Sequence, residues 1–265
     1  MMFELVASMV LTGALSVIVL FFILWIIHIF LNNAGVVDVG WGMGFLILSG
    51  IYSWMGQGFN FRNTLYFILV SLWGLRIVFF LLKRLVKEGY EDRRYQKIRK
   101  DWGGNMTLKF FFFFEFQALL EVILAVPFLI VSLNPSDNFT IMEFLGSFIF
   151  IGALLGETIA DEQLQRFKSD ARNKGKVCDV GLWRFSRHPN YFFEWLIWVG
   201  FFIFALGSSM GWLGIISPVI MYYLLNYVSG VPLAEEQSLQ SRGDAYRQYQ
   251  KRTSVFFPMP PKENI

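Results

Sequence analysis

Residues 5–31 read LVASMVLTGALSVIVLFFILWIIHIFL, an apolar run in which His28 is the one side chain that titrates near neutral pH. A helix of about 20 such residues crosses the hydrocarbon core of a bilayer. The run is too long for the apolar part of a signal peptide, no basic cluster precedes it, and no small-residue cleavage site is evident. We therefore expect this segment to be retained in the mature protein as a membrane-spanning helix.

The remainder of the chain has a similar composition. Hydrophobic residues make up 55% of the 265 residues, aromatic residues make up 18%, and the mean hydropathy is +0.49, which is high for a soluble domain. The sequence predicts an all-α polytopic membrane protein, with residues 1–265 forming a single transmembrane domain of seven helices. The expected spans are Leu5–Leu31, Val39–Met55, Leu65–Leu82, Phe110–Leu133, Ile141–Ala160, Tyr191–Leu206 and Trp212–Val228. Within the second, Gly40 and Gly44 have the small-xxx-small spacing that lets helices approach closely.

The positive charges are concentrated in three connections. Of the 23 Lys and Arg residues, nine lie in Lys83–Lys109, seven in Asp161–Pro189 and five after Val228. With seven spans these three segments fall on one side, and the positive-inside rule makes that side cytoplasmic. The N-terminus is then expected outside and the C-terminus inside.

The sequence also excludes several classes of site. A net charge of +3, without an unbroken basic tail, gives no sign of nucleic-acid binding. One cysteine, Cys178, cannot form an internal disulfide, and two histidines make a zinc site improbable, so we expect no metal. We also find no sign of an obligatory protein partner.

The segment GLWRFSRHPNYFFEW, Gly181–Trp195, is the first candidate site. Pro189 is tolerated in the first turn of a helix and is expected to begin the sixth span. Arg187 and His188 would then lie beside the positive end of the helix dipole, which favours an anion such as a phosphate. Asn190 and Glu194 follow on one face of the same helix. The alternative is an interfacial belt in which Arg187 reaches lipid headgroups.

The segment GETIADEQLQRFK at the end of the fifth span is the second candidate. Glu157, Asp161, Gln165 and Lys168 recur at helical spacing and so share one face. Two acids on adjacent turns are suited to ribose hydroxyls, with Lys168, Arg184 or Arg187 on phosphates. The alternative is pairing within the helix, for example of Asp161 with Gln165, and ordinary cytoplasmic charge.

Other polar residues have weaker patterns. The tail after Glu235 places Tyr246 and Tyr249 one turn apart, and it is either an amphipathic helix on the membrane or a lid over the other two segments. Arg76, inside the third span, needs a partner, for which Asp38 is one candidate. Glu121 in the fourth span is a further intramembrane acid without an obvious partner, whereas His28 is expected only to pack.

Several motifs in order resemble a largely bacterial membrane family related to steroid 5-alpha-reductases. They are VDVGWG, LWGLR through GYEDRRY, ADEQLQRFK, GLWRFSRHPNY and YRQYQKRTSVFFPMPPK, and together they cover most of the chain. The resemblance implies a seven-helix bundle whose C-terminal half, about 141–265, binds NADPH from the cytosol. Lipid substrate would enter from the bilayer, hydride would pass to the β carbon of an enone, and an acid would polarise the carbonyl or protonate the product. A bacterial inner membrane is the expected location, with the endoplasmic reticulum as the alternative.

The resemblance also assigns expected roles. Asp161, Lys168, Asn190 and Glu194 fall where the reductases have Asp, Arg, Asn and Glu around NADPH, and Glu157 falls where they have Asn. Arg76 matches an arginine of their third helix. The remaining candidates for the cofactor are Arg184, Arg187, His188, Tyr191, Glu235, Tyr246 and Tyr249. The catalytic Glu of the reductases is matched loosely by Asp38, and Trp73 stands where they have a catalytic Tyr. Because an indole cannot replace a phenol as a proton donor, the proton donor is not assigned.

A second family shares part of the pattern. RHPNY, followed by Glu235, Glu236 and the paired tyrosines, is also similar to isoprenylcysteine carboxyl methyltransferases and related phospholipid methyltransferases. The sequence therefore predicts an NADPH-dependent reductase of a lipid carbon–carbon double bond, with a membrane methyltransferase using S-adenosylmethionine as the alternative. A non-enzymatic lipid-binding membrane protein is the third possibility.

Overall fold

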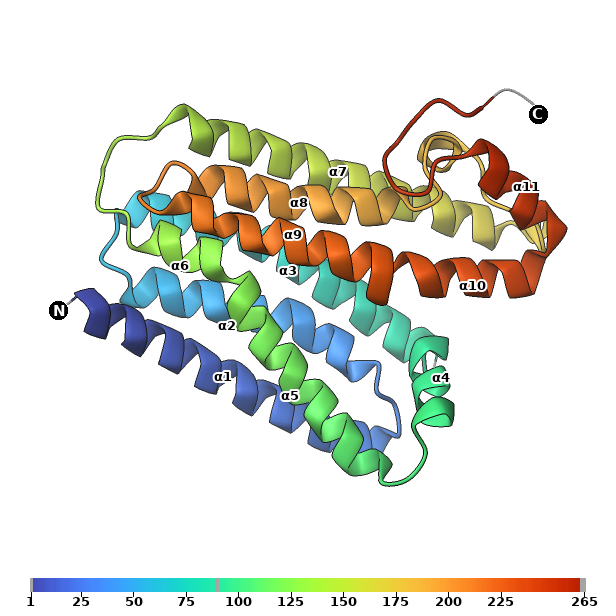
Figure 1. Ribbon diagram of the computed structural model, residues 1–265, viewed down its shortest axis with the longest axis horizontal. Coiled ribbons are helices and arrows are strands. Elements are labelled where there is room, and N and C mark those ends of the chain that lie inside the picture. Colours follow the sequence, from blue (N-terminus) through green and yellow to red (C-terminus); the bar gives the residue numbers. More distant parts are fainter. Residues whose placement is uncertain (1, 89–90, 263–265) are drawn as a thin grey trace. The chain divides into compact units, whose positions relative to one another are not determined.

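The computed structural model describes residues 2–88 and 91–262. Within those ranges every element of regular secondary structure is a helix (Figure 1). It divides into two compact units, Met1–Thr140 with Ala205–Ile216 and Ile141–Phe204 with Ser217–Ile265. We call these unit 1 and unit 2 and describe each by itself.

Unit 1 is built on three long apolar helices. Its elements are α1 (Met2–Leu31), α2 (Val36–Met55), α3 (Asn60–Glu88), α4 (Arg93–Trp102), α5 (Met106–Leu124), α6 (Val126–Ser132) and the 3-10 helix η3 (Gly211–Ile215). Helix α2 packs against α1, α3 and α5. As the glycine spacing predicts, α1 approaches α2 closely, because a Cβ added at Gly40 would lie 2.5 Å from Leu24 Cδ1.

The fourth expected span is broken. Helices α5 and α6 together have the length and apolar character of one span, but they are bent by 42°. Pro127, near the start of α6, has no N–H to donate to the preceding turn, which explains why α5 does not continue. The residue at the break, Ala125, is fully buried.

Unit 2 contains the remaining helices. They are α7 (Ile141–Ser169), η1 (Ala171–Asn173), η2 (Gly181–Arg184), α8 (Pro189–Ala205), α9 (Ile216–Tyr223), the π-helix η4 (Leu224–Val228), α10 (Val231–Arg242) and α11 (Asp244–Arg252). Helices α7 and α8 cross at glycines, since a Cβ on Gly146 would lie 2.4 Å from the backbone N of Phe204. The indole N–H of Trp195 on α8 donates to the carbonyl of Pro218 on α9 at 3.0 Å.

Within the described residues, five helical segments are long and apolar enough to cross a membrane, and the bent α5–α6 pair makes a sixth. The five are α1, α2, α3, α7 and the nearly continuous helix Gly211–Arg242. The prediction of a polytopic helical membrane protein is therefore confirmed at this level. Helix α8 is apolar but shorter.

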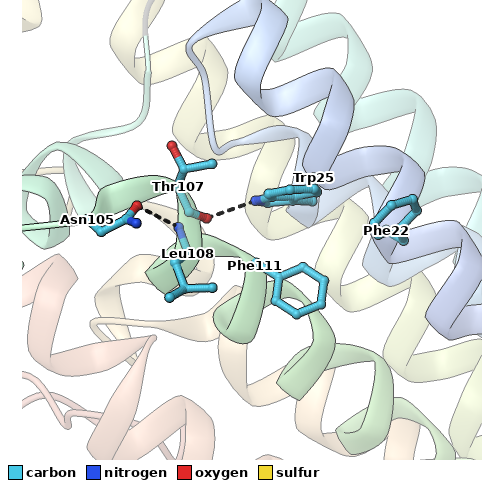
Figure 2. Close-up of a pocket in the computed structure, with 6 residues that line it drawn as sticks. All are labelled: Phe22, Trp25, Asn105, Thr107, Leu108 and Phe111. Atoms are coloured by element: carbon cyan, nitrogen blue, oxygen red, sulfur yellow. Dashed lines mark hydrogen bonds between the residues drawn. The ribbon is translucent and has the colours of Figure 1, made fainter.

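An open surface groove of about 390 Å³ lies between α1 and α5 in unit 1 (Figure 2). Its lining is Phe22, Trp25, Asn105, Thr107, Leu108 and Phe111. The Trp25 indole N–H donates to the Thr107 carbonyl at 3.0 Å, so the polar atom of this side chain is already hydrogen-bonded to another residue of the groove lining. The groove is mainly apolar, and none of its six lining residues titrates near neutral pH.

Candidate functional site

Helix α8 begins within the RHPNY segment. Pro189 begins α8, as the sequence predicts. The hydroxyl of Ser186 accepts from the backbone N–H of His188 at 3.1 Å, which satisfies one of the free donors at this helix end. The same hydroxyl donates to the carbonyl of Phe256 at 2.8 Å. The C-terminal segment is therefore attached directly to the start of α8.

A buried network connects α8 to α10 and α11 through one carboxylate. Glu235 Oε1 accepts from Arg187 Nε at 2.6 Å and from Tyr246 OH at 3.0 Å, and it lies 3.2 Å from His188 Nε2. Glu235 Oε2 accepts from Gln250 Nε2 at 2.5 Å. We call these five residues the Glu235 cluster. Four of the five were predicted from the sequence to bind the cofactor. Gln250 was not.

The cluster holds Arg187 and His188 firmly in place. The Nη1 of Arg187 also donates to the carbonyls of Gln250 at 3.0 Å and Thr253 at 2.8 Å. Burial lowers the pKa of His188 from its usual value of 6.5, and the hydrogen bond that Glu235 Oε1 accepts from this ring offsets the lowering only in part. His188 is thus neutral near pH 7. Its ring stacks on that of Tyr191, with 5.5 Å between the ring centroids.

The second tyrosine of the tail has a different role. Tyr249 is buried, and its hydroxyl donates to the carbonyl of Trp183, with the carbonyl of Ser186 3.3 Å away. The Trp183 indole in turn donates to the Ala160 carbonyl on α7 at 2.9 Å. Burial raises the pKa of Tyr249, so the phenol stays protonated and suited to donating these bonds. The tail folds back onto α8, as one of its two predicted arrangements required.

A second group of polar residues lies where α7 faces the start of α8. Asn190 Nδ2 donates to Asp161 Oδ1 at 3.3 Å. The other polar atom of this amide, Asn190 Oδ1, is buried and has no hydrogen-bond partner among the described residues. Glu157, one turn before Asp161 on α7, is buried, and Glu194, one turn after Asn190, accepts from the Trp198 indole at 3.1 Å. The face of α7 that carries Glu157 and Asp161 thus adjoins the face of α8 that carries Asn190.

The remaining candidates in unit 2 lie nearer the surface. Lys168, at the end of α7, and Arg184, at the end of η2, are both exposed. Within unit 2 the structure therefore brings together most of the predicted site residues in two adjacent groups. One group is the Glu235 cluster, and the other contains Asp161 and Asn190.

Asp38 and Arg76 belong to unit 1. Asp38 Oδ2 accepts from Arg94 at 2.7 Å and lies 3.5 Å from Arg84, and Asp38 Oδ1 accepts from Tyr95 OH at 2.5 Å. Both oxygens of the predicted catalytic acid are thus engaged by residues that sequence reasoning missed. Arg76 is half-buried on α3.

Helix α4 is held against the ends of α1 and α2 by further ion pairs. Arg99 donates to Glu91 at 2.7 Å and lies 3.1 Å from His28 Nε2, and Glu91 accepts from the backbone N–H of Ala34 at 2.8 Å. Burial raises the pKa of Tyr95, and the charge of Asp38 raises it further. We call Asp38, Arg84, Glu91, Arg94, Tyr95 and Arg99 the α4 cluster. The only signal for it in the sequence was the mixed charge of residues 83–100.

Metal binding is not indicated by the geometry. Among the described residues no group of three or more His, Cys, Asp or Glu side chains is arranged to hold a metal ion. Cys178 is buried, and burial raises the pKa of its thiol, so it has little thiolate character.

Comparison with known proteins connects this geometry to a family. Residues 24–253 match the family described as "Protein of unknown function (DUF1295)". The chain belongs to the DUF1295 family. The match includes every candidate residue from Asp38 to Tyr249, so both clusters lie inside the region that defines the DUF1295 proteins.

One relative is an uncharacterized protein of the fission yeast Schizosaccharomyces pombe. It is 26% identical over 279 residues, a match that covers 93% of this chain and 78% of the yeast protein. No solved structure gives a significant match to the chain.

Proposed function

We propose that this DUF1295 protein is an NADPH-dependent membrane reductase of a carbon–carbon double bond in a lipid, such as a sterol-like or polyprenoid enone. The observation that supports it is the contact between Asp161 and Asn190, with its open acceptor at Asn190 Oδ1. Buried polar atoms without a partner are rare in folded proteins and need an explanation. A ribose hydroxyl or the carboxamide of a nicotinamide carries the donor that this oxygen lacks.

The residues present fit such a cofactor in part. Asp161 supplies carboxylate oxygens for hydroxyl groups, and Lys168 and Arg184 are exposed cations suited to phosphates. Arg187 is less suited than the sequence suggested, because Glu235 and two backbone carbonyls already occupy its donors. We therefore assign Arg187, His188, Glu235, Tyr246 and Tyr249 mainly to holding the start of α8 in position.

The proposal includes the membrane topology. Adding α8 to the six possible spans gives the seven expected from the sequence. An odd number of spans puts the termini on opposite sides, and the three basic segments then place the C-terminus and the start of α8 in the cytosol. Cytosolic NADPH would reach this side of a bacterial inner membrane directly.

NADPH, when bound, would supply the hydride, so the chain needs to bind and orient the substrate and to provide one proton. Asp161 and Asn190 would orient the cofactor through hydrogen bonds. The resemblance to the reductases suggests Asp38 as the acid. Both of its oxygens are engaged, by Tyr95 and Arg94, so Asp38 would have to exchange a partner before it touched a substrate.

The test is binding and oxidation of NADPH by the protein in lipid nanodiscs, with a panel of enone lipids as acceptors. We expect Asp161→Ala and Asn190→Ala to weaken NADPH binding by roughly tenfold or more each, as for loss of a hydrogen bond to a buried or charged group. Arg166→Ala is the matched control, because Arg166 lies on the same helix and pairs in the exposed region with Glu162. The absence of NADPH binding by the wild-type protein would refute the proposal.

The Glu235 cluster is the observation that favours the alternative, a methyltransferase, because it joins RHPNY to Glu235 and Tyr246 in one network. Thermal unfolding with NADPH and with S-adenosylmethionine separates the two functions. A ligand at one hundred times its dissociation constant stabilises the folded state by about 2.7 kcal/mol. Stabilisation by S-adenosylmethionine alone would favour the methyltransferase, and no stabilisation by either would favour a lipid-binding protein.

A further inference from the structure

The segment after α11, residues 253–262, returns to the residues that lead into α8 and is held there by its backbone. The backbone N–H of Arg187 donates to the carbonyl of Ser254 at 2.8 Å, and the N–H of Met259 donates to the carbonyl of Phe185 at 2.9 Å. Figure 1 shows this part of the chain beyond α11, next to the short helices that precede α8. We call residues 253–262 the C-terminal segment, and all of it belongs to unit 2.

Two phenylalanines of the C-terminal segment pack on helices of unit 2. The ring centroid of Phe256 lies 5.4 Å from that of Tyr222 on α9, and the ring centroid of Phe257 lies 5.7 Å from that of Trp195 on α8. Phe256 is buried, whereas Phe257 is 46% exposed. One side of the segment is therefore fixed on the helices, and the other side is left uncovered.

The contact with Tyr222 indicates the depth of the segment. Tyr222 belongs to the nearly continuous helix Gly211–Arg242, which is long and apolar enough to cross a membrane. The first charged residue of this helix, Glu235, comes more than three turns later. Tyr223 and Tyr227 on the same helix are exposed. Because tyrosine and tryptophan gather at the membrane–water interface, the C-terminal segment meets this helix at the level expected for that interface.

The backbone of the C-terminal segment suits an interface, although it is not helical. Unbonded N–H groups are costly next to lipid, and three residues of the segment have none. They are Pro258, Pro260 and Pro261. Of the other two residues in this stretch, Met259 donates to the carbonyl of Phe185, and Lys262 donates to the carbonyl of Arg252 at 2.9 Å. Every backbone N–H from residue 258 to residue 262 is thus either absent or bonded.

Four apolar side chains of this region are exposed. They are Phe185, Val255, Phe257 and Met259, each between 40% and 58% exposed. Met259 and Phe185 lie side by side because their backbones are bonded. Single exposed apolar residues are normal on a protein surface, but a group of them marks a surface that contacts a partner or a membrane.

Two lysines flank these apolar side chains. Lys251, near the end of α11, and Lys262 are exposed, and no ion pair of either is recorded among the described residues. The neighbouring Arg252 is already paired with Asp179. Glu263 follows in the sequence and lies outside the described residues. Lysine is depleted at protein–protein interfaces but is attracted to anionic lipid headgroups, so a membrane surface fits this combination better than a protein partner.

We propose that the C-terminal segment is an anchor on the membrane surface, in which Phe257 and Met259 insert between lipids and two lysines bind the phosphate groups of anionic phospholipids. The lysines are Lys251 and Lys262, whose long side chains can reach headgroups while the apolar residues beside them enter the acyl boundary. The topology proposed above assigns the segment to the cytoplasmic leaflet. Arg184 is left for the cofactor phosphates, so the lipid site and the proposed cofactor site share no side chain.

Insertion is tested by the accessibility of a spin label on the protein in nanodiscs. Cys178→Ala removes the one thiol of the chain, and Met259→Cys then places a label on the C-terminal segment. Gln248→Cys places the control label on the exposed side of α11. We expect the label at position 259 to collide mainly with oxygen, which concentrates in lipid, and the label at position 248 mainly with a water-soluble nickel chelate. Equal access of the chelate to both labels would overturn the insertion.

Headgroup binding is tested by native mass spectrometry of the protein in detergent, which needs no cysteine substitution. Phosphatidylglycerol is the anionic lipid and phosphatidylcholine the neutral one. We expect the wild type to bind phosphatidylglycerol more tightly, and Lys251→Gln combined with Lys262→Gln to weaken that binding by about fivefold for each lysine. Binding of phosphatidylcholine should stay the same. Equal binding of the two lipids by the wild type would overturn the headgroup site.

The matched control is Lys174→Gln combined with Lys176→Gln, which removes the same charge from two exposed lysines of unit 2. Arg242, at the end of α10, donates to the carbonyl of Lys176 at 2.9 Å, so this loop lies at the end of α10 far from the apolar part of the helix. The control should retain most of the phosphatidylglycerol binding. An equal loss in the two double variants would show that only total charge matters and would overturn the site.

Neither measurement uses NADPH or an enone, so the outcome is separate from that of the proposed function. A chain that binds no NADPH would refute the reductase, and a lipid-exposed label at position 259 would still support the anchor. A water-exposed label at that position would overturn the anchor, and NADPH oxidation would still support the reductase.

Discussion

Two acids in this protein are both largely shielded from water but have opposite surroundings. Glu235 in unit 2 is contacted by four polar side chains and is joined by Arg187 at 2.6 Å. Glu121 in unit 1 is fully buried, and neither carboxyl oxygen has a hydrogen-bond partner among the residues that the structure describes. The first arrangement stabilises a charged carboxylate, and the second favours a neutral acid.

The difference shows which of the two acids connects helices. A carboxylate that is already saturated with donors has little capacity left for a ligand, and it fixes the elements that it joins. A neutral acid without partners contributes little to holding helices together and keeps a proton available. We therefore assign Glu235 to positioning α8, α10 and α11, a role for which Glu121 has no hydrogen bond among the described residues.

The largest expected effect on stability is that of removing the Glu235 carboxylate. Glu235→Ala would leave Arg187, His188 and Tyr246 partly buried without their common acceptor. Breaking a buried pair by removing one partner costs about 3–5 kcal/mol. We expect a loss of this size in the free energy of unfolding in nanodiscs. A loss comparable to that of the exposed control Arg166→Ala would show that the cluster does not hold these helices.

The next effect tests the close approach of Glu121 and Gly44. Gly44→Ala places a Cβ where the carboxyl lies, and overpacking of this kind costs about 1–3 kcal/mol. Glu121→Ala in the same chain would remove the three atoms that lie nearest to that Cβ. The double variant should therefore be more stable than Gly44→Ala alone. Additive losses in the double-mutant cycle would contradict the contact.

The smallest effect is the pH dependence of the Glu235 cluster. The pKa of His188 is lowered by burial, so the folded protein binds its proton less readily than the unfolded chain, whose value is near 6.5. The stability that this neutral histidine provides is fully present above pH 6.5 and is lost as the pH falls through its folded pKa.

Thermal unfolding between pH 7.5 and 5 measures this loss. We expect the melting temperature to fall with pH in the wild type and to fall less steeply in His188→Gln, which cannot titrate. Equal slopes in the two proteins would show that His188 is not the group responsible.

Much of the fold could be predicted from local sequence patterns. Apolar runs predicted the long helices, Pro189 predicted the start of α8, and Gly40 predicted the close contact with α1. The break at Ala125 was not predicted, although Pro127 was visible, because the surrounding run is as apolar as a continuous span.

The candidate site divides in the same way. The sequence by itself determined that the chain is helical and membrane-bound, and which polar residues needed an explanation, because periodicity and hydropathy are local properties. Only the tertiary structure decided which of these residues have partners. Glu235 meets Arg187 across 48 positions and Asp38 meets Tyr95 across 57, while Glu121 lies against Gly44 without a hydrogen-bond partner among the described residues. The state of a buried acid depends on such distant neighbours, and a single sequence does not specify them.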